Sequence, residues 1–139
     1  MDIFANPVLV AAAWAWAVAQ ALKFLVYSLR DRRINLRYLT TMGGMPSSHS
    51  ATVAGLATAV AVREGVRSTV FALALVFAFV VMYDAAGVRR AAMAQAKILN
   101  QIIDELFQGH PISETRLREL LGHTPFEVLI GALLGIVIA

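Results

Sequence analysis

Residues 7–29 read PVLVAAAWAWAVAQALKFLVYSL, an apolar run interrupted only by Gln20 and Lys23. A helix of about 20 apolar residues crosses the hydrocarbon core of a bilayer, so this run is long enough to span a membrane. Three further apolar blocks follow, at residues 51–62, 69–83 and 126–139. The block at 69–83 is marginal for a span, and the other two are short for one.

The composition indicates one membrane-embedded domain, residues 1–139. Of the 139 residues, 59% are hydrophobic and 15% charged, and the mean hydropathy is +0.69. A soluble helical bundle of this length would carry more charge on its outer faces, so that alternative is disfavoured. The absence of cysteine excludes disulfides and thiolate zinc sites. Residues 1–6 carry no Lys or Arg, so we expect no cleaved signal peptide.

Lysine and arginine are distributed unevenly if the four apolar blocks cross the membrane alternately. One face then receives Lys23, Arg30, Arg32, Arg33, Arg37, Arg89, Arg90, Lys97, Arg116 and Arg118. The opposite face receives only Arg63 and Arg67. The basic face is expected to be cytoplasmic, and His49 and His123 both fall on it. We therefore expect a protein of the bacterial inner (plasma) membrane with its active site facing the cytoplasm.

Periodicity and capping residues predict an all-α fold, a polytopic membrane bundle of about four to five helices with the active site at one membrane face. The expected helices begin at Asn6 or Pro7, at Pro46 or Ser47, after Ser68, and at Pro125. The third helix is expected to run as far as residue 107, and a short polar helix to cover residues 113–121. A polar connection fills residues 31–45. In the second helix, small side chains at residues 51, 54, 55, 58 and 59 favour close helix packing.

Two histidines follow small-residue turns, GGMPSSHS at residues 43–50 and GHTPFE at residues 122–127. A neutral imidazole can attack the phosphorus of a phosphate ester, without a metal or other cofactor, to form a phosphohistidine that water cleaves. Such a nucleophile needs a carboxylate on its other ring nitrogen. Glu127 lies one helical turn after His123. His49 is the natural proton donor for the leaving group. The structural alternatives are a helix cap or a contact with lipid headgroups for His49, and an ordinary turn residue for His123.

The phosphate group of such a substrate needs N–H donors and cations around it. The helix start at Ser47 and Ser48 offers backbone N–H groups and a positive dipole end. The candidate cations are Lys23, Arg30, Arg89, Arg90 and Arg118. Asp84, near membrane depth, either orients the site or pairs structurally with an arginine. Lys23 has the alternative of snorkelling to the interface.

Three segments resemble the divergent branch of the type 2 phosphatidic acid phosphatase superfamily, which also contains acid phosphatases and vanadium haloperoxidases. They are GGMPSSHS, MYDAAGVRRAA at residues 82–92 and LGHTPFEV at residues 121–128. The resemblance covers residues 23–139. It implies phosphatase chemistry through a phosphohistidine more firmly than it implies any substrate.

The resemblance also implies roles for individual residues. The superfamily's first motif is Lys, six residues, then Arg-Pro; Lys23 and Arg30 keep this spacing, with Asp31 in place of the proline and Arg37 as an alternative. The second motif, Pro-Ser-Gly-His, corresponds to residues 46–49 with Ser48 in place of glycine. This match implies that His49 is the general acid.

The third motif is only partly present. It consists of Ser-Arg, five residues, His, three residues and Asp; His123 and Glu127 keep the spacing, with Glu in place of Asp. No Ser-Arg pair precedes His123, because Arg118 is one residue too close and Arg116 one too far. Arg89 or Arg90, in the divergent branch's own segment around Asp84, is the expected replacement.

The sequence therefore predicts an integral membrane phosphatase that hydrolyses a lipid phosphate monoester or a lipid diphosphate. The expected partners are membrane lipids, the lipid phosphate substrate and a second copy, held through small-residue faces or helix 88–106, with no nucleic acid. The alternative is an inactive membrane protein that binds lipid phosphates. A transporter is disfavoured because the ionisable residues gather at one end. A metal hydrolase using His49, His123 and Asp84 lacks paired-ligand spacing.

Overall fold

The computed structural model describes residues 5–39, 44–106 and 123–139, without the side chains of residues 37, 39, 87–93 and 105. Over this part of the chain all regular structure is helical. The elements are α1 (Pro7–Asp31), the 3-10 helix η2 (Leu36–Leu39), α2 (Ser48–Glu64), α3 (Thr69–Leu106) and α4 (Pro125–Ile138). The predicted all-α membrane bundle is confirmed. The predicted polar helix at 113–121 lies outside the described residues.

The helix starts follow from capping residues that the chain places before each apolar run. The Asn6 side chain accepts hydrogen bonds from the N–H groups of Val8 and Leu9, and Pro7 occupies the first helical position. Ser47 caps α2 and Thr124 caps α4 through their hydroxyl groups. Each such cap contributes about 1 kcal/mol to helix stability. The predicted starts of α1 and α4 are therefore confirmed, and α2 begins at Ser48, directly after its cap.

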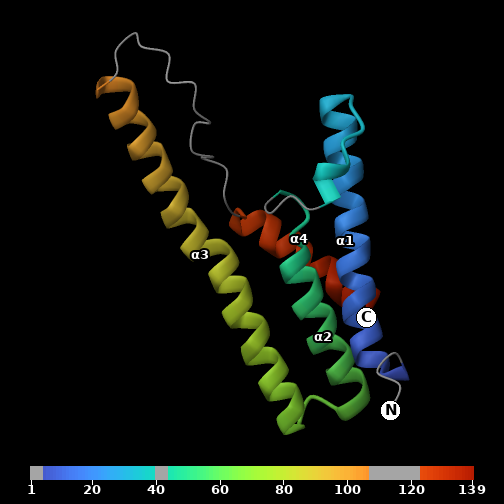
Figure 1. Ribbon diagram of the computed structural model, residues 1–139. Helices are drawn as coiled ribbons and strands as arrows, with labels where there is room; N and C mark the ends of the chain where they lie inside the picture. Colours follow the sequence, from blue (N-terminus) through green and yellow to red (C-terminus); the bar gives the residue numbers. More distant parts are fainter. Residues whose placement is uncertain (1–4, 40–43, 107–122) are drawn as a thin grey trace.

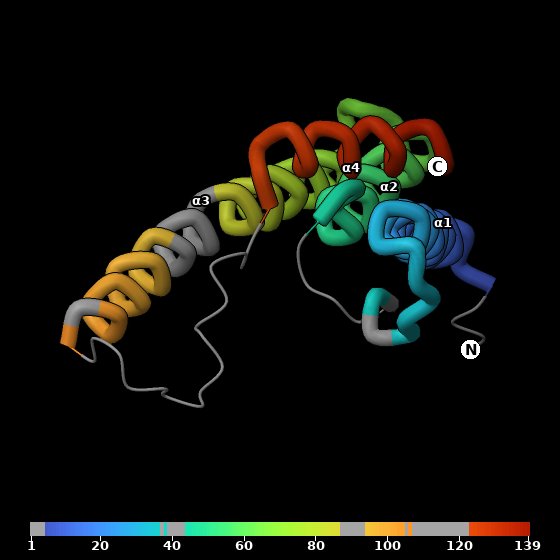
Figure 2. Tube along the Cα trace, turned by 90° about the horizontal axis from the view of Figure 1, so that it is seen from above, coloured from blue at the N-terminus to red at the C-terminus, as the bar shows by residue number. Residues whose placement is uncertain are grey.

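The helix α2 occupies the centre of the bundle and contacts α1, α3 and α4 (Figure 1). The chain runs up α1, down α2 and up α3, and α4 then crosses α2 obliquely toward α1 (Figures 1 and 2). This path brings the start of α2 and the start of α4 to about the same level, and α1 continues beyond it (Figure 1). The second half of α3 continues beyond that level (Figure 1).

Small residues allow α4 to lie directly on α2. A Cβ atom added at Gly131 would collide with the Ser47 carbonyl oxygen, and one added at Gly135 with the Ala51 carbonyl oxygen. At Gly55, an added Cβ atom would lie 2.9 Å from the Cβ atom of Ala15 on α1. Close backbone approach of this kind stabilises helix pairs in lipid. It also fixes the start of α2 against the first turns of α4.

We predict that Gly135→Val destabilises the bundle, because the larger side chain must push α4 away from the backbone of Ala51 and Gly55. The expected loss in the free energy of unfolding is about 2 kcal/mol. SDS-induced unfolding in mixed micelles measures it. Val137→Leu, at a position that is 82% exposed on the same helix, is the matched control. Equal stability of the two variants would contradict the close α2–α4 contact.

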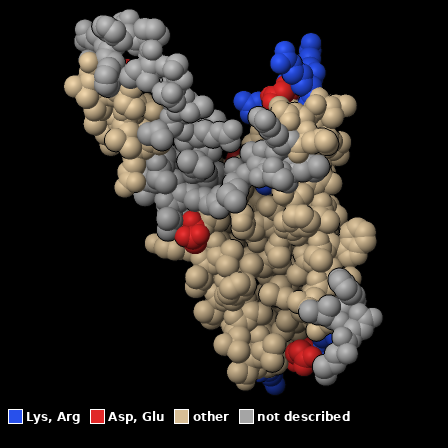
Figure 3. Space-filling model, viewed as in Figure 1, with Lys and Arg blue, Asp and Glu red and all other residues tan. Residues whose placement is uncertain are grey.

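The distribution of side chains is inverted relative to a soluble bundle. Among the described residues, every buried hydrophobic side chain is Ala or Val. Large side chains lie outside, as at Trp14, Leu73 and Phe77, which are 62%, 67% and 54% exposed. In the view of Figure 3, most of the exterior between the two charged ends is uncharged, with one acidic group on the left side. A lipid environment makes such an exterior favourable, because lipid tails solvate large apolar side chains as well as a protein core does.

Two helical segments are long and apolar enough to cross a membrane, Pro7–Asp31 and Thr69–Ala86. The 17 residues of α2 and the 14 of α4 are about 25 and 21 Å long, shorter than a hydrocarbon core of about 30 Å. The length expectations for the four apolar blocks are therefore confirmed. The helix η2 was not predicted, since residues 31–45 were expected to be an irregular polar connection.

Candidate functional site

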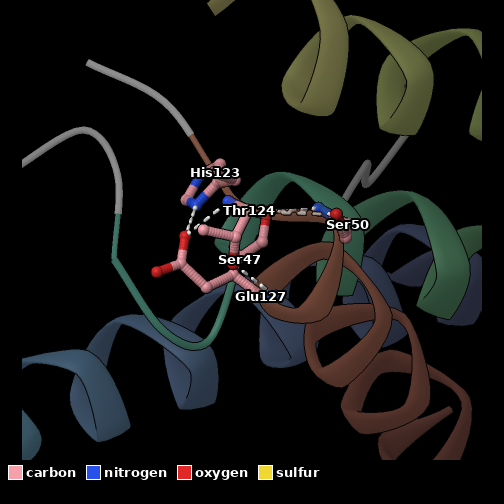
Figure 4. A network of polar contacts seen from close by, with 5 residues as sticks. All are labelled: Ser47, Ser50, His123, Thr124 and Glu127. Atoms are coloured by element: carbon pink, nitrogen blue, oxygen red, sulfur yellow. Dashed lines mark hydrogen bonds and ion pairs between the residues drawn. The ribbon is translucent and has the colours of Figure 1, made fainter. Parts of the chain in front are cut away.

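The predicted catalytic residues lie where the starts of α2 and α4 meet the side of α3. The Ser47 N–H group donates to the Glu127 carbonyl oxygen at 3.2 Å, which joins the two helix starts. The His123 N–H group donates to the Ala85 carbonyl oxygen of α3 at 3.4 Å. Figure 4 shows the resulting network of polar contacts around His123 and Ser47.

The His123 ring and the Glu127 carboxylate form a pair one helical turn apart. The Nδ1 atom of His123 lies 3.3 Å from Oε2 of Glu127. The same oxygen accepts the Thr124 N–H group at 3.0 Å, and Thr124 Oγ1 accepts the Glu127 N–H group at 3.2 Å. These reciprocal bonds are a capping box, which fixes the carboxylate in front of the ring.

The other nitrogen of the His123 ring, Nε2, is buried and makes no hydrogen bond among the described residues. The His123 residue is 4% exposed, and its Nε2 atom has no hydrogen-bond partner within the described part of the chain. With the proton on Nδ1 directed at Glu127, the Nε2 atom of the neutral ring carries a lone pair. A buried polar atom without a partner is unfavourable unless something else satisfies it. A hydrogen-bond donor or an electrophilic atom would satisfy this lone pair.

The surroundings favour the neutral form of His123, which precedes α4 and lies outside the candidate spans. Burial lowers the pKa of His123 below its usual value of 6.5, and the positive charge of Lys23 lowers it further. The hydrogen bond and charge of Glu127 act in the opposite direction, and His49 adds to the lowering. A ring with this pKa is uncharged, and therefore nucleophilic, at neutral pH.

His49 lies in the first turn of α2, beside the His123 ring. The ring centroids are 5.9 Å apart and the ring planes are inclined by 65°, so one ring presents its edge to the other. His49 is exposed whereas His123 is buried. The cap of α2 is Ser47, which excludes the alternative of His49 as the cap. This arrangement places one imidazole on the buried side of the site and the other on its open side.

Lys23 is the most deeply buried charged residue among those described, at 1% exposure. It follows Ala15 and Ala19 at intervals of four residues, so the three lie on one face of α1. The alanines pack against Ala51 of α2, and Lys23 continues this face toward the helix starts. Its burial makes the snorkelling alternative wrong. The positive charge of Lys23 lowers the pKa of His123.

The serines at the start of α2 are buried but differ in their roles. Ser47 Oγ accepts hydrogen bonds from the Ser50 N–H group at 3.3 Å and from the Ser50 hydroxyl at 3.0 Å (Figure 4). The Ser47 side chain is therefore engaged as a cap. Ser48 is 5% exposed and begins the helix. The first N–H groups of a helix lack acceptors within it and present a positive dipole end, which attracts anions.

The comparison with known proteins covers almost the whole chain. Residues 4–138 match the model of the Divergent PAP2 family. The protein belongs to this family. It is also 36% identical to the uncharacterized membrane protein YuiD of Bacillus subtilis (strain 168), over 99% of this chain and 94% of that protein. No solved structure matches it.

The remaining candidate site residues of this divergent PAP2 protein are either exposed or lie outside the described side chains. Arg30 and Asp84 are both exposed. Arg30 lies two turns beyond Lys23, about 10 Å along the axis of α1. Arg89 and Arg90 belong to α3, where the structure gives the backbone alone, and Arg118 lies outside the described residues.

Two contributors to the site were missed in the sequence. Thr124 positions Glu127 through the capping box, and the pattern Thr-x-x-Glu at residues 124–127 is the signal that predicts it. Ala85 supplies a backbone carbonyl to the His123 N–H group, a role that no side-chain pattern indicates. Among the described residues, no group of three or more His, Asp and Glu side chains is arranged to hold a metal ion.

Proposed function

We propose that this divergent PAP2 protein is a membrane phosphatase that cleaves a lipid phosphate monoester or a lipid diphosphate through a phosphohistidine on His123. The observation that carries the proposal is the His123 ring itself. Its Nδ1 atom is held by a carboxylate, its Nε2 atom is buried without a partner among the described residues, and a second histidine lies beside it. These are the features that a nucleophilic imidazole requires.

In the first step, the Nε2 lone pair of His123 forms a bond to phosphorus while the bond from phosphorus to the leaving oxygen breaks. Protonated His49 gives its proton to that oxygen. Glu127 stabilises the positive charge that develops on the His123 ring. Lys23 and the N-terminus of α2 balance the negative charge on the phosphate oxygens.

In the second step, neutral His49 takes a proton from water as the water oxygen attacks phosphorus. The bond between phosphorus and Nε2 breaks, inorganic phosphate leaves, and His49 is again protonated. Each histidine thus returns to its starting state. All proton movements involve residues of the chain and water, so this scheme predicts that EDTA leaves the reaction unaffected.

The surroundings of the site support a lipid as the substrate. Phe126, next to Glu127 at the start of α4, is 61% exposed. From there α4 exposes Leu129, Leu133 and Val137 along its length. A phosphate at His123 therefore has an apolar helix face beside it, along which a hydrocarbon chain of the substrate can lie. We propose that the site faces the cytoplasm, because Arg30, Arg32 and Arg33 gather at its end of α1.

The proposal is tested by phosphate release from a panel of lipid phosphates by the detergent-purified protein, with EDTA and with orthovanadate. We expect release that persists in EDTA and is inhibited by orthovanadate. Release that disappears in EDTA would contradict the mechanism.

The departure from the third motif favours one other function, an inactive lipid-phosphate-binding protein. Orthovanadate binding without any phosphate release would identify it.

The pH dependence of kcat/KM provides a prediction that uses the pKa of His123. The reactive form of the His123 ring is neutral, and the pKa of the ring is lowered. Activity should therefore persist below pH 6.5 before it falls along the acid limb of the profile. Glu127 raises this pKa. Glu127→Gln should therefore move the acid limb to lower pH, while kcat falls by up to about 10⁴-fold because the ring loses its carboxylate. An acid limb that moves to higher pH in Glu127→Gln would contradict the pairing.

A further inference from the structure

The turn that leads into α2 is held from two sides. From α4, the Glu127 carbonyl oxygen accepts the Ser47 N–H group at 3.2 Å. From α1, the end of the Tyr27 ring lies against Gly44. A Cβ atom added at Gly44 would collide with the Tyr27 hydroxyl and lie 2.8 Å from two carbons of its ring. We propose that Tyr27 is a positioning residue of the site, whose ring holds this turn and thereby keeps the start of α2 in place against His123. The inference rests on the proposed phosphatase function.

Gly44 has the backbone conformation and the small size that this contact needs. Its φ of 83° lies in the left-handed region, which glycine adopts without the strain that a side chain brings. The missing Cβ atom then lets the backbone approach the Tyr27 ring directly. A larger residue at position 44 would have to move either the ring or the turn.

The Tyr27 ring is itself held by η2, which packs against α1 (Figure 1). The Tyr38 ring stacks on it, with ring centroids 5.3 Å apart and ring planes inclined by 29°. The Tyr38 hydroxyl donates to the carboxylate of Asp31, the last residue of α1, at 2.6 Å. Tyr38 is thus fixed at its hydroxyl, and its ring limits the movement of Tyr27. The position of α1 is transmitted through these rings to the turn at Gly44.

The two elements that Tyr27 joins carry different parts of the proposed reaction. Lys23 lies one helical turn before Tyr27 on α1, so the two side chains share a face of the helix. Ser48 and His49 begin α2 directly after the turn. The buried cation therefore comes from α1, whereas the N–H groups and the proton donor come from α2. Since a misplacement of about 1 Å can lower a rate about 10²-fold, the contact between Tyr27 and Gly44 should affect turnover.

The test compares purified Tyr27→Leu, Tyr27→Phe and Tyr83→Leu with the unaltered protein. Leucine keeps an apolar side chain at position 27 but is too short to reach Gly44, whereas phenylalanine keeps the ring. Tyr83, which is 81% exposed on α3, provides the matched control. Values of kcat and KM are measured with a lipid phosphate in detergent micelles, and orthovanadate affinity is measured by calorimetry.

We expect Tyr27→Leu to lower kcat by about 10²-fold and to weaken orthovanadate binding by about tenfold, because the groups of α2 move away from the phosphate. The KM should change by less than about threefold, since the apolar face of α4 that binds the hydrocarbon chain is unaltered. Tyr27→Phe and Tyr83→Leu should both keep kcat within about threefold of the unaltered protein.

Gly44→Ala and the double variant with Tyr27→Leu test the contact itself. The added methyl group collides with the Tyr27 ring, so Gly44→Ala alone should lower kcat by about tenfold or more. In the double variant the shorter side chain removes the collision. Its kcat should therefore lie within about threefold of that of Tyr27→Leu alone, because the effects of residues in contact are not additive.

Thermal unfolding in detergent identifies any variant that fails to fold. Unchanged kcat in Tyr27→Leu, with a lowered unfolding temperature, would show that the ring serves stability alone. Equal losses in Tyr27→Phe and Tyr27→Leu, unchanged kcat in Gly44→Ala, or a double variant whose loss is the product of the two single losses would also overturn the assignment. A protein that neither hydrolyses lipid phosphates nor binds orthovanadate would overturn the proposed function together with it.

Discussion

Replacing His123 by alanine should reduce phosphate release by a factor on the order of 10⁴ or more, the largest effect expected from any single substitution. The reason is that Nε2 of His123 is the only atom to which the scheme transfers the phosphoryl group. The rate of phosphate release from a lipid phosphate at saturating concentration measures the effect. His123 is a small part of the packed interior, so the variant should remain folded in detergent.

The third histidine of the chain provides the matched control for this substitution. His110→Ala removes the same ring from a position that the mechanism does not use, and it should retain nearly full activity. His49→Ala should be impaired in both steps but retain the nucleophile. If His123→Ala kept more than a few per cent of the activity, another residue would have to accept the phosphoryl group.

Replacing Lys23 by methionine should also produce a large loss of activity. Methionine has a similar length and tolerates burial, so the α1–α2 packing is expected to persist. Loss of the buried cation should lower kcat/KM by about 10²- to 10³-fold. The reason is that the phosphate loses its attraction to the lysine, and this attraction is strong where water is excluded. The kinetics of the purified variant, with Lys97→Met as the exposed control, measure this effect.

The same substitution has a second expected result that a purely structural role would not produce. The charge of Lys23 lowers the pKa of His123. Its removal raises that pKa, so the acid limb of the activity profile should move to higher pH. This shift is opposite to the one expected for Glu127→Gln. A Lys23→Met variant with unchanged acid limb and unchanged kcat/KM would show that the lysine acts outside the site.

The helices were predictable because their starts depend on local chemistry. Asn6, Ser47 and Thr124 each satisfy N–H groups of the turn that follows them, and the apolar runs behind them have the length of helices. The relation between His123 and Glu127 was predictable for the same reason, since residues four apart meet on a helix. These features depend only on residues that are close to one another in the sequence.

The features that depend on helix packing were harder to predict. The spacing of Lys23 fits both an interfacial and a buried lysine, and the choice depends on α1 packing against α2 through Ala15 and Ala19. The contact between Ala85 and His123 joins residues that are distant in the sequence through a backbone atom. The helix η2 depends on Tyr38, which stacks on Tyr27 and donates its hydroxyl to Asp31 at 2.6 Å. No local sequence pattern indicates these contacts, because they depend on how the helices pack.

The central claim is that His123 becomes phosphorylated during turnover. The most direct measurement is mass spectrometry of the His49→Ala variant after incubation with a lipid phosphate and quenching in alkali, in which phosphohistidine survives. This variant lacks the group that activates water in the second step, so the phosphorylated form should accumulate over the long incubation that its slowed first step requires. We predict a phosphoryl group on the peptide that contains His123, and none in the double variant that also carries His123→Ala. The mechanism would be contradicted if the unaltered protein turns over the substrate but no phosphoryl group is found on His123 in the unaltered protein or in the His49→Ala variant.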